Sequence, residues 1–136
     1  MKFITLGGYE RRVSKIKKYI IDWDGKSKSK IQFKSKKFLE KYWKNHVVFE
    51  EFPVAGTLLS LDFYNASKKI AVEVQGGQHR RYVPFFHNNY KNNYLDQLRR
   101  DRDKRKFCEI NDITLVEVYD TDKISKSLFK KFNVSL

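Results

Sequence analysis

Two acidic residues on neighbouring extended segments are candidates for binding a metal ion. Asp62 lies in the run LLSLDFY at residues 58–64, and Glu73 lies in the run KIAVEVQ at residues 69–75. Phosphodiester hydrolysis needs a divalent cation that activates water and neutralises charge on the transferring phosphate. Mg²⁺ prefers carboxylate oxygens and keeps several of its waters. We therefore predict a site for Mg²⁺ or Mn²⁺ at Asp62 and Glu73.

The alternative is that these carboxylates merely line a solvated face of a sheet. The run IAVEV around Glu73 argues against it, because apolar neighbours on both sides predict a buried strand. Acidic residues are rarely buried without a partner. A shared metal ion is such a partner.

His79 follows Gly76 and Gly77, which directly end the segment that carries Glu73. Glycines allow a sharp turn of the backbone, which could aim the imidazole back over the carboxylates. A neutral imidazole could then position or deprotonate a water, or protonate a leaving oxygen. The alternative is an ordinary loop histidine.

Asp101 lies in a charged stretch whose spacing predicts a helix over residues 94–109. It falls on nearly the same stripe as Leu98 and Cys108 and is therefore expected to face the sheet. It either completes the site or forms a salt bridge to Arg105. Lys104, one turn further along, is expected to contact phosphate. Cys108, the single cysteine, is expected to be buried.

The chain is strongly basic, with 29 Lys and Arg against 16 Asp and Glu and a formal net charge of +13. Such a charge attracts polyanions, of which nucleic acid is the first to consider. Any single basic run is usually a solvated face, but several runs around an acidic centre resemble a clamp on a phosphate backbone. The residues predicted to contact double-stranded DNA are Lys37, Lys41, Arg80, Arg81, Arg99, Arg100 and Lys104.

A membrane surface is the competing partner for a basic protein. The sequence holds no apolar run of 18 residues and no signal peptide at its start, so we expect a soluble cytoplasmic protein without a membrane partner. The oligomeric state is left open, a homodimer included.

The elements that must position the site follow from periodicity and turn residues. Helical spacing over 29–43 predicts an amphipathic helix, 47–52 a strand, 113–119 a further strand, and about 122–132 a C-terminal helix. Residues 58–64 and 69–75 predict a hairpin around the loop 65–68. In that register Tyr64 faces Lys69, Leu61 faces Val72, and Asp62 faces Ala71 with Glu73 diagonal. Leu61 and Phe63 are then expected on one face of the sheet, and the polar residues on the other.

The order of elements is helix, three strands, helix, strand and helix. It predicts a mixed α/β (α+β) fold of αβββαβ type, with a central mixed sheet flanked by helices. The length of 136 residues suits one compact domain. We expect residues 26–136 to form it, and residues 1–25 to form a small β-like arm, with a hairpin within 9–23.

The succession LDFY, IAVEVQGGQH, QLRRDRDKRKFC and ITLVEVY resembles the PD-(D/E)xK nuclease superfamily. It looks most similar to the branch of very-short-patch-repair endonucleases and phage-encoded EDxHD homing endonucleases. The resemblance covers about residues 29–119. It implies a restriction-endonuclease-like core and an intracellular, phage-type enzyme acting in a bacterial host.

The resemblance also implies roles for individual residues. Asp62 matches the metal-binding aspartate, and Glu73 and Gln75 match the (D/E)xK strand, with Gln75 where lysine is usual. His79 and Asp101 match the histidine and last aspartate of the EDxHD set. Gln32 stands where an acid of the first helix is expected, and Glu40 is the substitute if the alignment slips. Gln cannot act as a base, so metal-activated water or His79 would have to serve.

We therefore predict an Mg²⁺-dependent DNA endonuclease of homing or very-short-patch-repair type. A Holliday-junction-type resolvase is the alternative within the class. A catalytically silent DNA-binding module on a nuclease core is the alternative from another class, favoured by Gln32 and Gln75. An RNA-binding protein is a third reading.

Overall fold

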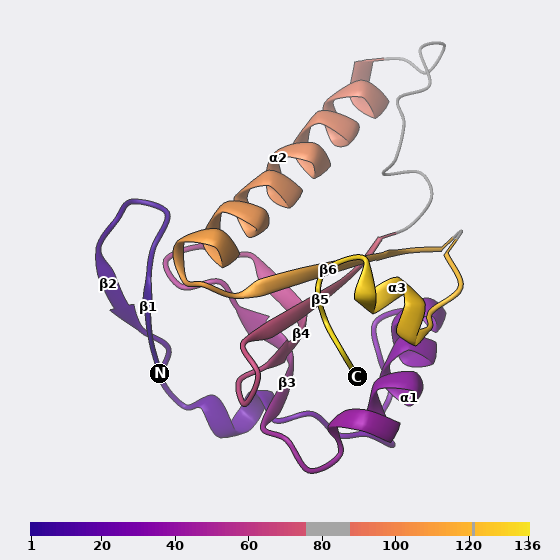
Figure 1. The fold of residues 1–136 in the computed structure, drawn as a ribbon. Coiled ribbons are helices and arrows are strands. Elements are labelled where there is room, and N and C mark those ends of the chain that lie inside the picture. Colours follow the sequence, from indigo (N-terminus) through magenta and orange to yellow (C-terminus); the bar gives the residue numbers. More distant parts are fainter. Residues whose placement is uncertain (76–87, 121) are drawn as a thin grey trace.

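The computed structural model describes residues 1–75, 88–120 and 122–136, with only the backbone described for 88–92. Along the chain the elements are β1 (Lys2–Ile4), β2 (Glu10–Arg12), a 3-10 helix (Ile16–Tyr19), α1 (Lys30–Trp43), β3 (Val48–Pro53), β4 (Ser60–Asn65), β5 (Ile70–Gln75), α2 (Asn88–Ile110), β6 (Thr114–Tyr119) and α3 (Lys126–Lys130). From α1 onward this is the predicted order of elements (Figure 1).

The central sheet has four strands in the order β3-β4-β5-β6. The first two pairings are antiparallel, and β5 pairs with β6 in parallel. A parallel neighbour needs a crossover connection, and α2 lies within the segment that makes it. The predicted mixed sheet flanked by helices is therefore confirmed.

Helix α1 begins where the sequence predicts. Ser29 is its N-cap, and the Ser29 hydroxyl accepts a hydrogen bond from the Gln32 backbone N–H at 3.2 Å. The residues buried on α1 recur every three or four positions, so that one stripe of the helix faces the sheet. That stripe consists of Gln32, Ser35, Lys36, Leu39 and Trp43.

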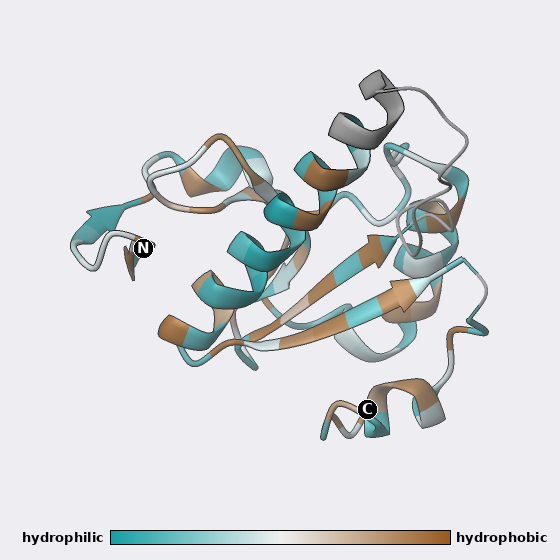
Figure 2. Cartoon of the chain, turned by 90° about the horizontal axis from the view of Figure 1, so that it is seen from above, coloured by the Kyte–Doolittle hydropathy of each residue, from teal (hydrophilic) through white to brown (hydrophobic). Residues whose placement is uncertain are grey.

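Two apolar clusters cover the two faces of the sheet. Leu39 and Trp43 of α1 pack with Phe129 of α3 and the strand residues Phe63 and Val72. On the other face Phe107 and Cys108 of α2 pack with Phe52, Tyr64 and Phe3. Figure 1 shows α2 on one side of the strands and α1 with α3 on the other, and Figure 2 shows α2 crossing the sheet seen from above.

The hairpin between β4 and β5 does not have the predicted register. Asn65 pairs with Ile70 and Phe63 pairs with Val72, so each residue of β4 lies opposite a residue of β5 two positions later than expected. Buried Asn65 explains the change: its side chain contacts Nδ1 of His46 at 3.0 Å and accepts from the backbone N–H of Lys68 at 3.0 Å. These bonds hold Asn65 in the strand, and the turn moves to residues 66–69. Continued by one step, this register places Asp62 opposite Glu73.

The prediction that Leu61 and Phe63 share one face is also wrong. Leu61 packs in the cluster on the α2 side, whereas Phe63 packs in the cluster on the α1 side. The reason lies in the neighbouring strand, where Glu51 adopts a left-handed φ of 53°. This residue interrupts the alternation of β3, so that Phe49 and Phe52 both face the α2 side.

The chain ends differ from the predictions in extent. The N-terminal hairpin is β1 with β2, so it lies at residues 2–12, and the stretch 9–23 holds its second strand, the 3-10 helix and a bridge from Ile20 to Phe49. Phe3 of this hairpin packs against Phe52 and Phe107, which joins it to the core. At the other end, α3 is shorter than the predicted 122–132, and α2 begins before the predicted 94. A separate arm over 1–25 stays a prediction.

A buried lysine ties the segment before α1 to the sheet. The Lys36 side chain is fully buried, and its ammonium forms an ion pair with Glu50 at 2.8 Å. It also donates to the carbonyl oxygens of Asp22 and Gly25 at 3.0 and 2.9 Å. The charge of Lys36 is therefore neutralised inside the protein and does not belong to its basic surface.

We expect Lys36→Met to lower the free energy of unfolding by about 3–5 kcal/mol, because breaking a buried pair leaves the other charge without compensation. Lys37→Met is the matched control, since Lys37 lies on the solvent side of the same helix in exposed ion pairs. Its effect should be close to zero. Urea unfolding of both variants measures this, and equal losses would contradict the structural role of Lys36.

Candidate metal and nucleic-acid site

Asp62 and Glu73 lie side by side at the centre of the sheet. Both side chains are buried, with relative exposures of 7% and 3%. The Asp62 backbone N–H donates to Oε2 of Glu73 at 2.6 Å. In return, Oδ2 of Asp62 accepts from the backbone N–H of Val74 at 2.7 Å. Each carboxylate thus bonds to the backbone of the other's strand, which fixes the pair just beyond the last paired residues Phe63 and Val72 of β4 and β5.

Burial makes this pair electrostatically costly. It raises the pKa of Glu73 to about 8, helped by the negative charge of Asp62 and opposed by Lys104. Burial also raises the pKa of Asp62, against the hydrogen bond from Val74 and the charge of Lys104. Two desolvated acids at close range favour a cation between them.

Lys104 of α2 supplies a positive charge at this position. Its ammonium contacts Oε1 of Glu73 at 2.5 Å, and its side chain is 15% exposed. Burial would lower the pKa of Lys104, but the charges of Glu73, Asp62 and Asp101 raise it above its usual value. The sequence predicted a phosphate contact for Lys104, so its bond to Glu73 was missed. The spacing of three from Asp101 was the available signal, since it puts both residues on one face of the helix.

Asp101 is buried and faces the sheet as predicted. Its Oδ1 accepts a hydrogen bond from the Gln97 side chain at 2.9 Å. The predicted alternative, a salt bridge from Asp101 to Arg105, is wrong. Arg105 instead donates to both carboxylate oxygens of Glu117, each at 2.7 Å. Glu117 of β6 is the register partner of Glu73, so α2 places a positive charge on each of two adjacent strands.

Gln32, the expected first-helix position, contacts the neighbouring strand. Its side-chain amide donates to Glu50 at 2.9 Å and to Glu51 at 3.0 Å. Glu51 also accepts from the Ser60 hydroxyl at 3.1 Å, and its charge raises the pKa of Asp62. Glu51 therefore brings an acid near the pair from β3, which the sequence did not predict because the left-handed turn at this residue redirects it. Glu40, the other candidate, binds Lys37 at 3.2 Å.

Gln75 ends β5 and is buried, with 4% exposure. It lies two residues after Glu73 on β5, and its register partner on β6 is Tyr119. The structure thus brings together Asp62, Glu73, Lys104 and the end of β5, with Asp101 on the helix above them.

His79, Arg80 and Arg81 lie outside the described residues. Their predicted roles in proton transfer and phosphate binding stay predictions.

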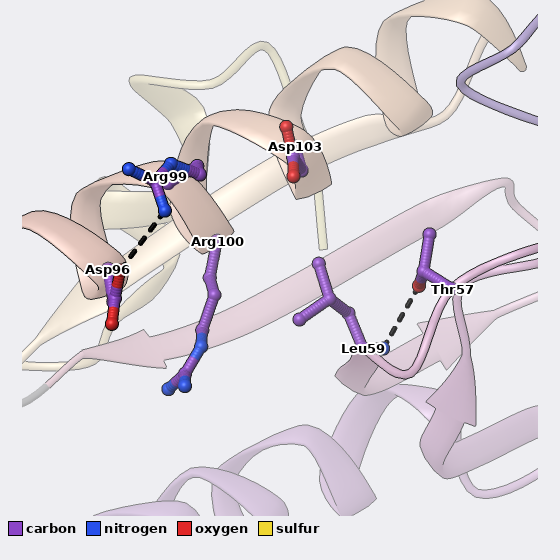
Figure 3. Close-up of a pocket in the computed structure, with 6 residues that line it drawn as sticks. All are labelled: Thr57, Leu59, Asp96, Arg99, Arg100 and Asp103. Atoms are coloured by element: carbon purple, nitrogen blue, oxygen red, sulfur yellow. Dashed lines mark hydrogen bonds and ion pairs between the residues drawn. The ribbon is translucent and has the colours of Figure 1, made fainter.

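The remaining basic candidates lie on the surfaces of α1 and α2. Lys37 forms exposed ion pairs, and the ammonium of Lys41 lies over the ring of Phe38 at 5.6 Å. Arg99 pairs with Asp96 at 3.1 Å, and Arg100 extends beside it from the same helix (Figure 3). A pocket of about 330 Å³ lies between this part of α2 and the β3–β4 turn. Its lining residues are Thr57, Leu59, Asp96, Arg99, Arg100 and Asp103.

The pair of carboxylates fits a hard divalent cation by its donor chemistry. Carboxylate oxygens are preferred ligands of Mg²⁺, which commonly takes one or two of them and completes its shell with water and substrate phosphate. Within the described ranges no group of three or more His, Cys, Asp or Glu side chains could hold a metal ion. Asp62 and Glu73 would thus supply two ligands. Cys108 takes no part, because burial raises the pKa of its thiol to about 12.

Three viral proteins are similar to part of this chain. Uncharacterized protein 307L of Invertebrate iridescent virus 6 is 39% identical over 74 residues, which are 54% of this chain and 37% of that protein. Uncharacterized protein 033L of Invertebrate iridescent virus 3 is 38% identical over 73 residues, again 54% and 37%. Uncharacterized protein 094L of Frog virus 3 (isolate Goorha) is 39% identical over 79 residues, or 58% and 51%.

The matched stretch thus covers only about a third to a half of each viral protein. No protein-family model and no solved structure matches the chain. Among the helices that the structure describes, none is long and apolar enough to cross a membrane. The function is therefore argued from the site.

The raised pKa of Glu73 makes the stability of the metal-free protein depend on pH. Between its ordinary value of about 4.3 and about 8, the folded protein keeps a proton that the unfolded chain has lost. The free energy of unfolding should therefore fall as pH rises through this window, by about 1.4 kcal/mol for each unit of raised pKa. Asp62→Asn should flatten this fall, because the charge of Asp62 helps to raise the pKa of Glu73. Urea unfolding of both proteins at a series of pH values tests this, and parallel curves would refute the coupling.

Proposed function

We propose that this chain is a metal-dependent DNA endonuclease with a restriction-endonuclease-like core, and that Asp62 and Glu73 hold the metal. One observation carries the proposal: two buried carboxylates meet on adjacent strands, beneath a helix that carries exposed arginines. Burying such a pair is unfavourable unless a cation offsets it. The net charge of +13 supports a polyanionic substrate.

The chemistry divides between the cation and the protein. A bound Mg²⁺ or Mn²⁺ would activate water and neutralise charge on the transferring phosphate. Arg99 and Arg100 lie on the exposed side of α2, where they bind the DNA backbone and fix its position. Gln75 cannot act as a base, so either the metal alone activates the attacking water or the imidazole of His79 takes its proton.

Within this class the resemblance favours a homing or very-short-patch-repair type of endonuclease, as a monomer or homodimer acting on double-stranded DNA in the cytoplasm. A Holliday-junction-type resolvase is the nearest alternative. The second candidate from another class is a catalytically silent DNA-binding module. The Lys104–Glu73 ion pair favours it, because an internal cation already offsets part of the buried charge.

Asp62→Asn should abolish cleavage and leave DNA affinity within a few-fold, because it removes a metal ligand without changing the basic surface. Nicking of supercoiled plasmid with Mg²⁺ or Mn²⁺ measures cleavage, and a binding titration measures DNA affinity. Glu109→Gln is the matched control, since Glu109 is an exposed acid on α2 outside the proposed metal and DNA contacts. A wild-type protein that binds DNA but cuts with neither metal would support the silent module.

Binding to duplex DNA should depend steeply on salt, since the proposed contacts are to phosphates. Six to ten such contacts make the logarithm of the binding constant fall against the logarithm of the salt concentration with a slope of roughly −5 to −9. Arg100→Ala should reduce this slope by about one and weaken binding to all sequences alike. Titrations at several salt concentrations measure it, and a wild-type slope near −1 would show that the basic surface does not meet DNA.

A further inference from the structure

Both oxygens of Glu73 are occupied inside the protein. Oε2 accepts from the backbone N–H of Asp62 at 2.6 Å, and Oε1 accepts from the ammonium of Lys104 at 2.5 Å. A cation that binds Glu73 has to displace one of these donors or share its oxygen. The Asp62 N–H belongs to the sheet and is fixed, whereas Lys104 has a flexible four-carbon side chain that is 15% exposed. Lys104 is therefore the donor that can leave.

The ammonium of Lys104 and a divalent cation compete for the same charges. Glu73, Asp62 and Asp101 all act on Lys104 and stabilise its positive form. An ammonium group close to a divalent cation repels it, and the repulsion is stronger in a partly buried site than in bulk water. As long as Lys104 stays on Glu73, it weakens the binding of any second cation there.

A DNA phosphate offers Lys104 another acceptor. Arg100 lies one helical turn before Lys104 and is exposed, so a phosphate backbone bound along α2 passes close to the lysine. A phosphate oxygen is a strong acceptor for an ammonium group. The exchange moves Lys104 outward without a change in the sheet.

We propose that Lys104 couples DNA binding to metal binding. In the free protein its ammonium holds Glu73; when a duplex binds along α2, the ammonium moves from Oε1 of Glu73 to a phosphate, and that oxygen becomes available to the cation. This inference rests on the proposed function, since it takes Asp62 and Glu73 as the metal site. Metal then binds weakly to the free protein and tightly to the DNA complex.

The coupling is reciprocal and has a measurable size. Couplings between two ligands commonly change an affinity by about 5- to 150-fold. Duplex DNA should raise the Mn²⁺ affinity of the wild-type protein by a factor in this range, and Mn²⁺ should raise the DNA affinity by the same factor. The affinity follows from the electron paramagnetic resonance signal of free Mn²⁺, titrated with and without a saturating short duplex.

Lys104→Met removes the competing charge and keeps most of the side-chain volume. It should bind Mn²⁺ without DNA about as tightly as the wild-type complex does, and DNA should then have little effect. Lys104→Arg keeps the charge and should keep the coupling. Lys106→Met is the matched control, because it removes the same charge from an exposed position of α2 and should behave as the wild type. Circular dichroism checks that each variant is folded.

The outcomes separate this inference from the proposed function. If Lys104→Met binds Mn²⁺ no more tightly than the wild type without DNA, or if DNA strengthens Mn²⁺ binding equally in both, the coupling through Lys104 is refuted. Absence of Mn²⁺ binding in every sample refutes it as well. Cleavage is scored on a gel from the same samples. If the protein shows the coupling but leaves the duplex intact, the proposed nuclease activity is refuted. The proposed movement of Lys104 from Glu73 to a phosphate is then supported.

Discussion

The hydrogen bonds that Asp62 and Glu73 each accept from the other's strand are the constraint on which the rest of the site depends. Each carboxylate accepts an N–H from the partner strand, so the two acids are part of the sheet rather than groups attached to it. A carboxylate that accepts a buried N–H satisfies a donor that would otherwise be costly to leave unpaired. The arrangement removes freedom from both side chains and holds them together before any ligand arrives.

Helix α2 supplies positive side chains that offset the negative charge of the buried acids. Its residues 101, 104, 105 and 108 recur at helical spacing and face the sheet, with Cys108 in the apolar cluster. Lys104 reaches Glu73 on β5, and Arg105 reaches Glu117 on β6. Apolar packing at one end of α2 thus positions two ion pairs further along it. The same helix turns exposed arginines to solvent at residues 99 and 100, which joins the site to the basic surface.

The sequence predicts the elements that local rules control and misses those set by tertiary contacts. The first helix over about 29–43, the αβββαβ order and the burial of Glu73 follow from spacing and turn residues, and all are present. The hairpin register could not be predicted, because it depends on hydrogen bonds of the Asn65 side chain. These bonds, to His46 and to the backbone of Lys68, hold Asn65 in the strand. Glu51 comes near Asp62 because its backbone adopts a left-handed φ. Glutamate rarely adopts this conformation, so the sequence gives no sign of it.

The ion-paired lysines Lys36 and Lys104 show how one residue type serves two purposes in a small basic protein. Lys36 is fully enclosed, and two carbonyl oxygens and a carboxylate surround its ammonium. Such a charge has no route to solvent and acts only to hold the chain together. Lys104 contacts a carboxylate just as closely but keeps 15% of its side chain exposed, at the edge between the acids and the arginines of α2. Because an exchange of partners needs a path along which the ammonium stays solvated or paired, only the second lysine can respond to a ligand. The difference in exposure separates a structural ion pair from one that an incoming phosphate can open.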